Sequence, residues 1–310
     1  MSGRARAATC AALCLVSRIS GAQHAEHGSR SVPAPPAARD SAVTAFISRG
    51  RAGTFRYRDQ SAAVTDGYRR LGPDFPAMGE HWVNPEIVAK GIFDAARPGL
   101  LTYARVNGVP ALTGVVYALP LEDNEEPPDF PFDRSHWHDH VGTVDDESLL
   151  LNHDVVHGPI GGLRLAVLHA WIWVDNPDGI FVTDNWALPA TRLGLRVDRA
   201  PPFATARALA LISGELPYYL SLAEGLGQPS EVELAYVRQV LGRHTFDMRA
   251  WWENRRLGAP GVVPDSATGV APLSVAEQAL LAGMWDSAWA DIERGVSAET
   301  GARLRRIWRP

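Results

Sequence analysis

The sequence predicts an α+β protein with a β-rich first part, a sheet or a barrel-like sheet, followed by an α-helical part. Alternating apolar patterns typical of strands occur between residues 73 and 198. After Pro201 and Pro202 the composition changes to Leu- and Ala-rich segments with helical spacing. We therefore expect a β-rich domain over residues 41–200 and a helical part over residues 201–310.

The first residues have the pattern of an export signal. Arg4 and Arg6 precede an uncharged stretch over residues 7–16, and small residues further on fit a cleavage site. This predicts a signal peptide at residues 1–22, a disordered linker at 23–40 and a periplasmic or secreted location. A disordered cytosolic leader is the alternative.

The bulk composition excludes several classes of protein. Hydrophobic residues make up 46% and charged residues 21% of the chain, which is typical of a globular protein. No stripe of Lys and Arg favours nucleic acid, and no apolar run is long enough for a membrane span. Both cysteines, Cys10 and Cys14, lie in the predicted signal peptide, so a mature chain would have no thiol chemistry. The oligomeric state is left open.

Two segments of the first part have clear strand patterns. Residues 100–106 and 111–119 flank Asn107-Gly108, which predicts a hairpin. Residues 165–174 alternate with apolar side chains on both faces, which predicts a central strand ending at the turn of residues 176–179.

The second part has helix signals. We expect a helical segment over residues 203–226 that is interrupted at Pro217, and two helices that open on capping boxes, over 230–244 and 274–294. Five tryptophans at helical spacing are expected to pack in the core of this part: Trp251, Trp252, Trp285, Trp289 and Trp308.

Histidine is concentrated in one short part of the chain. Six of the ten histidines fall between residues 136 and 169. Imidazole is the commonest metal ligand and also titrates near neutral pH, so the cluster predicts a metal site, an acid–base site or both. These six residues are His136, His138, His140, His153, His157 and His169.

The spacing of the first three histidines suggests a ligand set. If residues 136–140 are extended, His136, His138 and His140 point to one face and the two residues between them to the other. Successive positions on one face are nearly 7 Å apart, so three rings in a row rarely reach one ion. We therefore expect two of these histidines plus His169 or His81 to hold a divalent zinc, copper, iron or manganese ion.

Other candidate residues would surround this ion. Glu80 or Asp139 could be a general base, or could orient a ligating imidazole. Neighbouring residues on a strand point in opposite directions, so Glu80 and His81 would share a site only in a turn. Five residues are expected to form an aromatic and polar rim that binds substrate: Trp82, Trp137, Trp171, Trp173 and Asn176.

Two weaker possibilities remain. His153 and His157 have the spacing of metal ligands on a helix, but Gly and Pro follow directly and favour a loop. Glu215, Glu224 and His244 could form a carboxylate–histidine site on facing helices, although no Glu-x-x-His pair supports it.

Two sequence blocks resemble a known family. Met78-Gly-Glu-His-Trp-Val-Asn-Pro85 and Leu168-His-Ala-Trp-Ile-Trp-Val-Asp-Asn-Pro-Asp-Gly-Ile-Phe181 are similar to blocks of a family of exported bacterial proteins defined by a domain of unknown function. The resemblance covers about residues 73–190. It implies one site that contains His81 and His169, and it implies no reaction. The residues expected around this site are Trp82, Trp171 and Asn176.

Three hypotheses follow from these patterns. The first is an exported metal-binding protein, with an enzyme as one possible form, because an open coordination position could hold water or substrate. The second is a metal-free module that binds a small molecule in a pocket lined by Trp and His. The third is a structural or interaction protein whose histidines have no shared role.

Overall fold

A computed structural model describes most of the chain after residue 35. The described residues are 36–122, 124–129, 131, 133–142, 163–225, 229–258 and 272–308. Residues 1–35 are outside these ranges, so the predicted signal peptide and most of the predicted linker lie outside the described residues.

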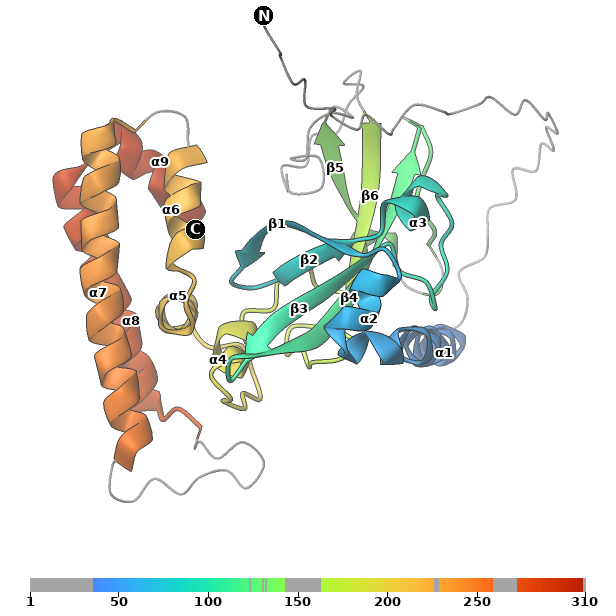
Figure 1. Cartoon of the computed structure of the whole chain (residues 1–310), viewed down its shortest axis with the longest axis horizontal. Helices are drawn as coiled ribbons and strands as arrows, with labels where there is room; N and C mark the ends of the chain where they lie inside the picture. Colours follow the sequence, from blue (N-terminus) through green and yellow to red (C-terminus); the bar gives the residue numbers. More distant parts are fainter. Residues whose placement is uncertain are drawn as a thin grey trace, which may run out of the picture. The chain divides into compact units, whose positions relative to one another are not determined.

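Six antiparallel strands form one curled sheet, and helices follow it in the chain (Figure 1). The strand order is β1-β2-β3-β4-β6-β5, so β6 lies between β4 and β5. This arrangement confirms the predicted α+β class. The strands are β1 (Arg69–Phe75), β2 (Gly79–Val83), β3 (Leu100–Val106), β4 (Val109–Leu121), β5 (His138–Gly142) and β6 (Leu163–Ala170).

The predicted hairpin is confirmed. Strands β3 and β4 pair antiparallel, and Asn107 and Gly108 in the turn have φ angles of 50° and 80°. Two successive residues with positive φ define the tight turn that matches the twist of a hairpin, and Asn-Gly tolerates it best.

The strand predicted over residues 165–174 ends earlier than expected. β6 stops at Ala170, because the next backbone amides leave the ladder. The Trp171 amide donates to the carbonyl of Ile180 at 2.8 Å, and the Trp173 amide donates to that of Thr113 at 3.1 Å. The residues after Ala170 therefore form a loop that folds back beside the sheet.

Along the sequence, helices occur before the first strand, between strands and after the last strand. Helix α1 begins at Pro36, within the segment expected to be a linker, and its sequence has no strong apolar stripe that would have revealed it. The helices are α1 (Pro36–Thr54), α2 (Gln60–Thr65), α3 (Pro85–Ala89), α4 (Leu188–Arg192), α5 (Phe203–Ser213), α6 (Leu216–Gly225), α7 (Glu231–Gly258), α8 (Val275–Gly295) and α9 (Ala298–Trp308), and short 3₁₀ turns span Phe55–Arg58 and Arg134–His136.

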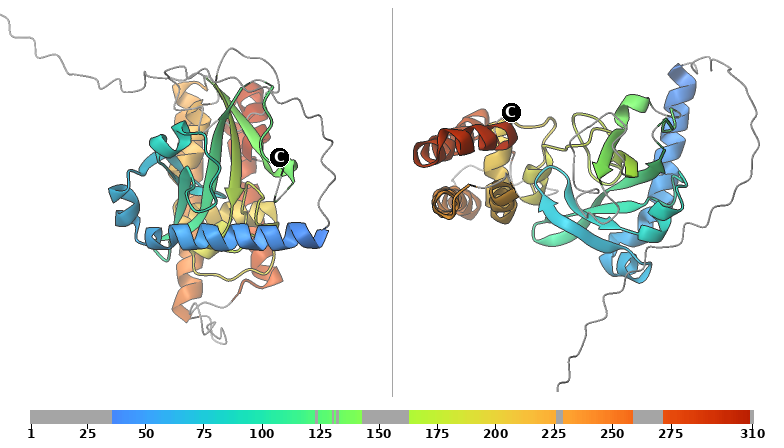
Figure 2. Two further views of the ribbon diagram at one scale, coloured as in Figure 1. Left: turned by 90° about the vertical axis from the view of Figure 1, so that its right-hand side faces the viewer. Right: turned by 90° about the horizontal axis from the view of Figure 1, so that it is seen from above.

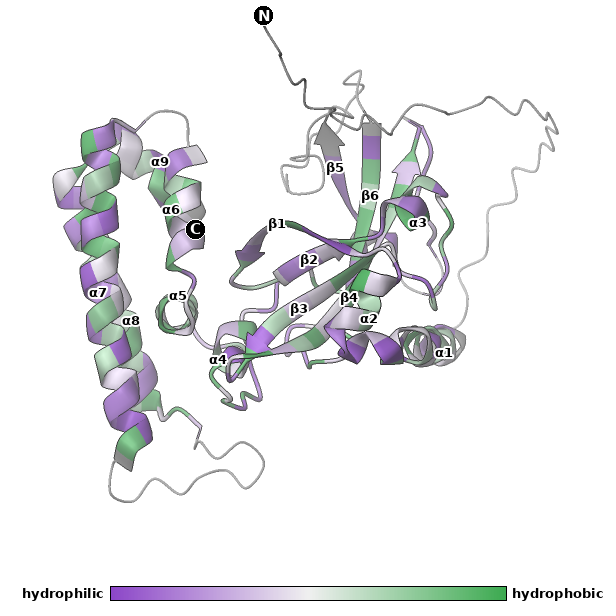
Figure 3. Ribbon diagram, in the orientation of Figure 1, coloured by the Kyte–Doolittle hydropathy of each residue, from purple (hydrophilic) through white to green (hydrophobic). Residues whose placement is uncertain are grey.

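Helix α1 crosses one face of the sheet (Figure 2), which we call the packing face. Phe46 of α1 lies 5.2 Å from Tyr117 of β4 between ring centroids, and the Tyr117 hydroxyl donates to the carbonyl of Ala95 at 2.8 Å. The apolar character of β4 and β6 is visible in Figure 3. Large apolar side chains thus hold α1 to this face, since burial of such side chains is the main stabilising contribution in a core.

The helical part has the predicted starts, and two of its predicted ends at residues 226 and 294 are within one residue of the observed ends of α6 and α8. The break between α5 and α6 falls at Gly214, whose φ of 113° is the left-handed conformation that ends a helix, and Pro217 lies in the first turn of α6. Helix α7 runs to Gly258 rather than to His244, because no Gly or Pro interrupts residues 245–257.

The helix core confirms the role expected for the tryptophans. Trp252, Trp285, Trp289 and Trp308 are buried in one apolar cluster, and Trp251 packs against it. The capping box of Ser274 and Glu277 opens α8, with each side chain bonded to the backbone of the other. Within the described residues, no helix has the length and apolar character needed to cross a membrane.

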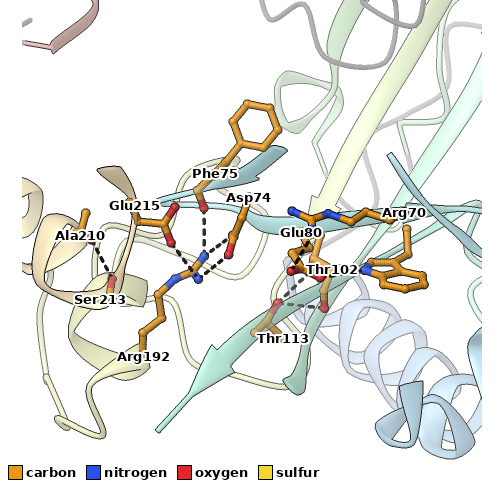
Figure 4. A network of polar contacts seen from close by, with 11 residues as sticks. Arg70, Asp74, Phe75, Glu80, Thr102, Thr113, Arg192, Ala210, Ser213 and Glu215 are labelled. Atoms are coloured by element: carbon orange, nitrogen blue, oxygen red, sulfur yellow. Dashed lines mark hydrogen bonds and ion pairs between the residues drawn. The ribbon is translucent and has the colours of Figure 1, made fainter. Parts of the chain in front are cut away.

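A buried ion-pair cluster connects the sheet to the helical part (Figure 4). Arg192 of α4 donates to both carboxylate oxygens of Asp74 in β1, at 2.6 and 2.8 Å, and lies 3.0 Å from Glu215 before α6. Burial raises the pKa of Glu215 to about 8, with the negative charge of Asp74 in the same direction and Arg192 opposing. One buried guanidinium therefore contacts two carboxyl groups, that of the buried Glu215 and that of the half-buried Asp74.

Candidate functional site

Four histidines from three strands lie on the sheet face opposite to the packing face. His81 is opposite Thr102, His169 is opposite Val116, and directly opposed residues in a sheet share a face. His138 is opposite Val167, which lies two residues before His169, and His140 follows His138 at the next position on that face. We call His81, His138, His140 and His169 the histidine cluster.

The rings of the cluster touch in a row. The centroids of His81 and His169 are 5.6 Å apart, those of His169 and His138 are 5.6 Å apart, and those of His138 and His140 are 5.0 Å apart. His81, His140 and His169 are each at most 5% exposed, and His138 is half-buried. The fold thus gathers polar, titratable rings away from solvent, where imidazole nitrogens are satisfied by hydrogen bonds or a metal.

The distance between the two imidazoles of β5 is compatible with a shared metal ion and with a hydrogen bond. The Nε2 atoms of His138 and His140 are 3.1 Å apart. Two nitrogens at 2.0–2.1 Å from one ion are about 2.9 Å apart at a right angle and about 3.4 Å apart at a tetrahedral angle. The observed spacing lies between these values. It is also a hydrogen-bond distance for two rings of which one carries the proton.

Thr183 contacts the other nitrogen of His138. Its hydroxyl lies 3.4 Å from His138 Nδ1. If Nδ1–H of His138 donates a hydrogen bond to this hydroxyl, the proton is on Nδ1 and Nε2 has a free lone pair for a metal. Such a second contact commonly sets the tautomer of a ligating histidine. Thr183 was not anticipated from the sequence, because it lies in a loop with no local pattern around it.

His136, the third histidine of the predicted row, is elsewhere. It lies in a 3₁₀ turn that ends before β5 starts, so it does not continue the alternation of His138 and His140. Its ring contacts Phe181, with centroids 5.4 Å apart. The expectation that residues 136–140 form one extended segment was therefore wrong at its first residue.

The two carboxylates proposed as bases point away from the cluster. Asp139 alternates with His138 and His140 on β5 and pairs with Arg164 at 2.9 Å. Glu80 is next to His81 on β2, as expected for opposite directions, and lies 3.4 Å from Arg70 with a hydrogen bond from Trp82 Nε1. Both carboxylates are engaged in ion pairs on the other side of their strands.

The four tryptophans expected as a rim serve the core and the loops instead. Trp82 and Trp137 pack with the aromatic cluster under α1. The indole of Trp173 donates to Thr54 at 3.0 Å, and the indole of Trp171 donates to the carbonyl of Val182 at 2.7 Å.

Trp171 and Asn176 have an indirect connection to the cluster. The Asn176 amide donates to the carbonyl of Asp184 at 3.0 Å, and the Trp171 indole holds Val182. Together they fix the two residues on either side of Thr183. The conspicuous block from Leu168 to Phe181 therefore positions the loop that contacts His138.

A cavity of about 250 Å³ lies beside the histidine cluster. Its lining includes Phe75, whose ring contacts His81 with centroids 5.5 Å apart, and Thr183, which contacts His138. Arg207 of α5 and Asp184 also line it. Arg207 could have been noticed in the sequence, because it is the one charged residue of the apolar helix α5. The structure shows that its side chain is buried.

The alternative helix site is not assembled. Glu215 pairs with Arg192, Glu224 with Arg238, and His244 with Asp291 at 2.9 Å. These three predicted partners thus belong to three separate polar contacts.

Within the described ranges, no three His, Cys, Asp or Glu side chains are already arranged as a metal-binding group. His153 and His157 lie outside the described residues. The fold and the cluster define an α+β protein with a histidine-lined sheet face beside a small cavity. In comparisons with known proteins, no family model, no curated protein and no solved structure matched the chain.

Proposed function

We propose that this protein is exported and binds a divalent transition-metal ion through His138 and His140, with His169 as the third ligand. The observation that carries the proposal is the 3.1 Å separation between the two Nε2 atoms on β5. A pair of imidazoles with this spacing suits zinc, copper, iron or manganese, which all accept nitrogen ligands.

The position of His169 supports its role as third ligand. Its ring packs against that of His138 from the neighbouring strand, and a change of side-chain torsion would turn a nitrogen towards the His138–His140 pair. His81 lies behind His169 in the row and would orient it through a ring contact. Three protein ligands leave a fourth position for water or substrate, which is the arrangement of catalytic zinc sites.

The experiment is a measurement of metal content and affinity on purified protein. We expect about one equivalent of ion by elemental analysis and, after chelation, rebinding of Zn²⁺ or Co²⁺ by calorimetry. Bound Co²⁺ in a site with low coordination number also absorbs visible light, so its binding can be followed by absorption spectroscopy. The double variant His138→Ala/His140→Ala should lose this binding.

His136→Ala is the matched control, since it removes a neighbouring imidazole that lies outside the cluster. Equal loss in the control, or no stoichiometric binding by the unaltered protein, would reject the proposal. Export is tested separately, with residues 1–22 fused to a reporter that is active only outside the cytoplasm. The fused reporter should be active, and the same reporter without residues 1–22 should be inactive.

A further inference from the structure

The cavity beside the histidine cluster contains two opposite charges in an apolar surrounding. It lies among the turn between β1 and β2, the loop after Val182, and helices α5 and α6. Its charged lining residues are Arg207 and Asp184. The histidine cluster and the metal proposal use neither of them, so their presence needs a separate account.

Arg207 provides a buried positive charge. Its side chain is only 4% exposed, and its guanidinium carbon lies 4.1 Å from the ring centroid of Phe203 and 5.4 Å from that of Trp186. Aromatic faces stabilise a guanidinium, and the Arg207 side chain also hydrogen-bonds with Tyr219. A guanidinium has five N–H donors, so this bond does not prevent it from donating to a ligand as well. A carboxylate is the acceptor that matches the N–H edge of a guanidinium best.

Asp184 provides the negative charge. Burial raises the pKa of its carboxyl group, while Arg207 and a hydrogen bond with Trp186 oppose this shift. The two charges of the cavity attract each other, so the site as a whole is balanced. A ligand with only one charge would leave one of the two protein groups uncompensated in a partly buried site, and this is costly.

Apart from the hydroxyl groups of Thr183 and Tyr218, the remaining walls are apolar, and the volume is small. Phe75, Met78, Trp186 and Tyr218 contribute rings and a thioether to the lining. At about 250 Å³ the cavity is smaller than pockets for drug-sized molecules, which span roughly 300–1,000 Å³. The occupant should therefore be a small molecule with an apolar body and two opposite charges.

We propose that this cavity binds an α-amino acid with an apolar side chain. Its carboxylate pairs with Arg207, its ammonium group pairs with Asp184, and its side chain lies against Phe75, Met78 and Trp186. The proposal does not require the metal, because neither charged residue is a proposed ligand.

The test compares three probes of matched shape on the full-length protein by calorimetry. L-leucine carries both charges, 4-methylpentanoate carries only the carboxylate, and 3-methylbutylamine carries only the ammonium group. We expect leucine to bind at least about tenfold more tightly than either analogue, because each analogue leaves one buried charge without its partner. Trp186 lines the cavity, so tryptophan fluorescence should report the same affinities.

Two variants assign the charges. Asp184→Asn is nearly isosteric and should remove the preference for leucine over 4-methylpentanoate. Asp178→Asn, an exposed residue of the same loop, should leave the preference intact. Arg207→Gln should abolish carboxylate binding, with circular dichroism to confirm that the variant is folded. Binding of leucine to the His138→Ala/His140→Ala variant separates this proposal from the metal site.

Three results would overturn the proposal: no binding of leucine to the unaltered protein, binding of an analogue as tight as that of leucine, or an unchanged preference in Asp184→Asn.

Discussion

The two faces of the sheet are built from the same strands and differ in what they hold. On β6, Leu168 points to the packing face and is fully buried under aromatic side chains. Its neighbour His169 points to the other face and contacts two further imidazoles. One residue of displacement along the strand therefore separates the aromatic core from a face on which imidazoles lie beside buried aliphatic side chains such as Val116 and Val167.

The difference between the two faces explains why the tryptophans next to the histidines in the sequence do not lie beside them in the structure. Tryptophans beside histidines in the sequence suggest a shared pocket, but alternation sends adjacent residues to opposite faces. Trp137 and Trp82 each neighbour a histidine of the cluster, and both pack with the aromatic core under α1. Two adjacent residues on a strand are thus expected to lie on opposite faces of the sheet and not in one pocket.

The packing face should respond to mutation as a hydrophobic core. Leu168→Ala leaves a cavity in a fully buried site, and such substitutions cost about 2–5 kcal/mol of the free energy of unfolding. Denaturant unfolding should show this loss, while the amount of bound metal stays unchanged. Loss of metal from a folded Leu168→Ala protein would contradict the separation of the two faces.

The buried carboxyl group outside both faces provides a pH test. The pKa of Glu215 is about 8 in the fold, above its ordinary value of 4.5. Between these values the folded state holds a proton that the unfolded state releases, so stability falls as pH rises from about 4.5 through 8 and then levels off. Glu215→Gln should remove this fall and stabilise the protein at pH 8.5 by an amount on the order of 3 kcal/mol, with little effect at pH 4.

Glu224→Gln is the control for the pH test, because Glu224 forms an exposed ion pair. Thermal unfolding at both pH values measures the difference. A slope with pH that is the same in Glu215→Gln and in the unaltered protein would show that another group controls it.

The histidine face should respond through metal affinity. His169→Ala removes the proposed third ligand and should weaken Zn²⁺ binding by about 100-fold, equivalent to about 2.7 kcal/mol. Its effect on unfolding of the metal-free protein should be smaller than that of Leu168→Ala, although the two residues are adjacent. Calorimetry with Zn²⁺ decides, and affinity equal to that of the unaltered protein would remove His169 from the site.

The weakest effect is expected at Thr183. Thr183→Val keeps the shape of the side chain and removes the hydroxyl near His138 Nδ1. Partners that orient a ligating histidine commonly contribute tenfold or more to affinity, and at a distance of 3.4 Å we expect about tenfold or less. Thr191→Val, on α4, is a matched control. Zn²⁺ titrations of both variants should differ, and identical affinities would assign Thr183 a packing role.

Local signals predicted much of the fold. Asn107-Gly108 predicted the hairpin, and the Ser274–Glu277 capping box predicted α8, because each signal acts through backbone groups a few residues away. The hairpin of β1 and β2 gave no such signal: β1 contains Gly72 and Pro73, which disfavour a regular strand and accompany a shift of register in its pairing.

The candidate site was only partly predictable. Alternation placed His138 and His140 on one face, and the choice of His81 and His169 as their companions matches the residues that lie together in the structure. Thr183 and Phe75 were missed, since their contacts depend on how distant loops pack, and Arg207 was missed although it is the one charged residue of the apolar helix α5. No spacing within the sequence encodes such contacts.

The pair His138 and His140 lies on β5, which in the described sheet is an outermost strand and bonds to β6 alone. An ion shared with His169 would add a crosslink between β5 and β6 to the ladder of backbone hydrogen bonds. Loading with metal should then slow the exchange of β5 amide protons with deuterated water. The exchange rates of the amide protons of the interior strand β3 should change little.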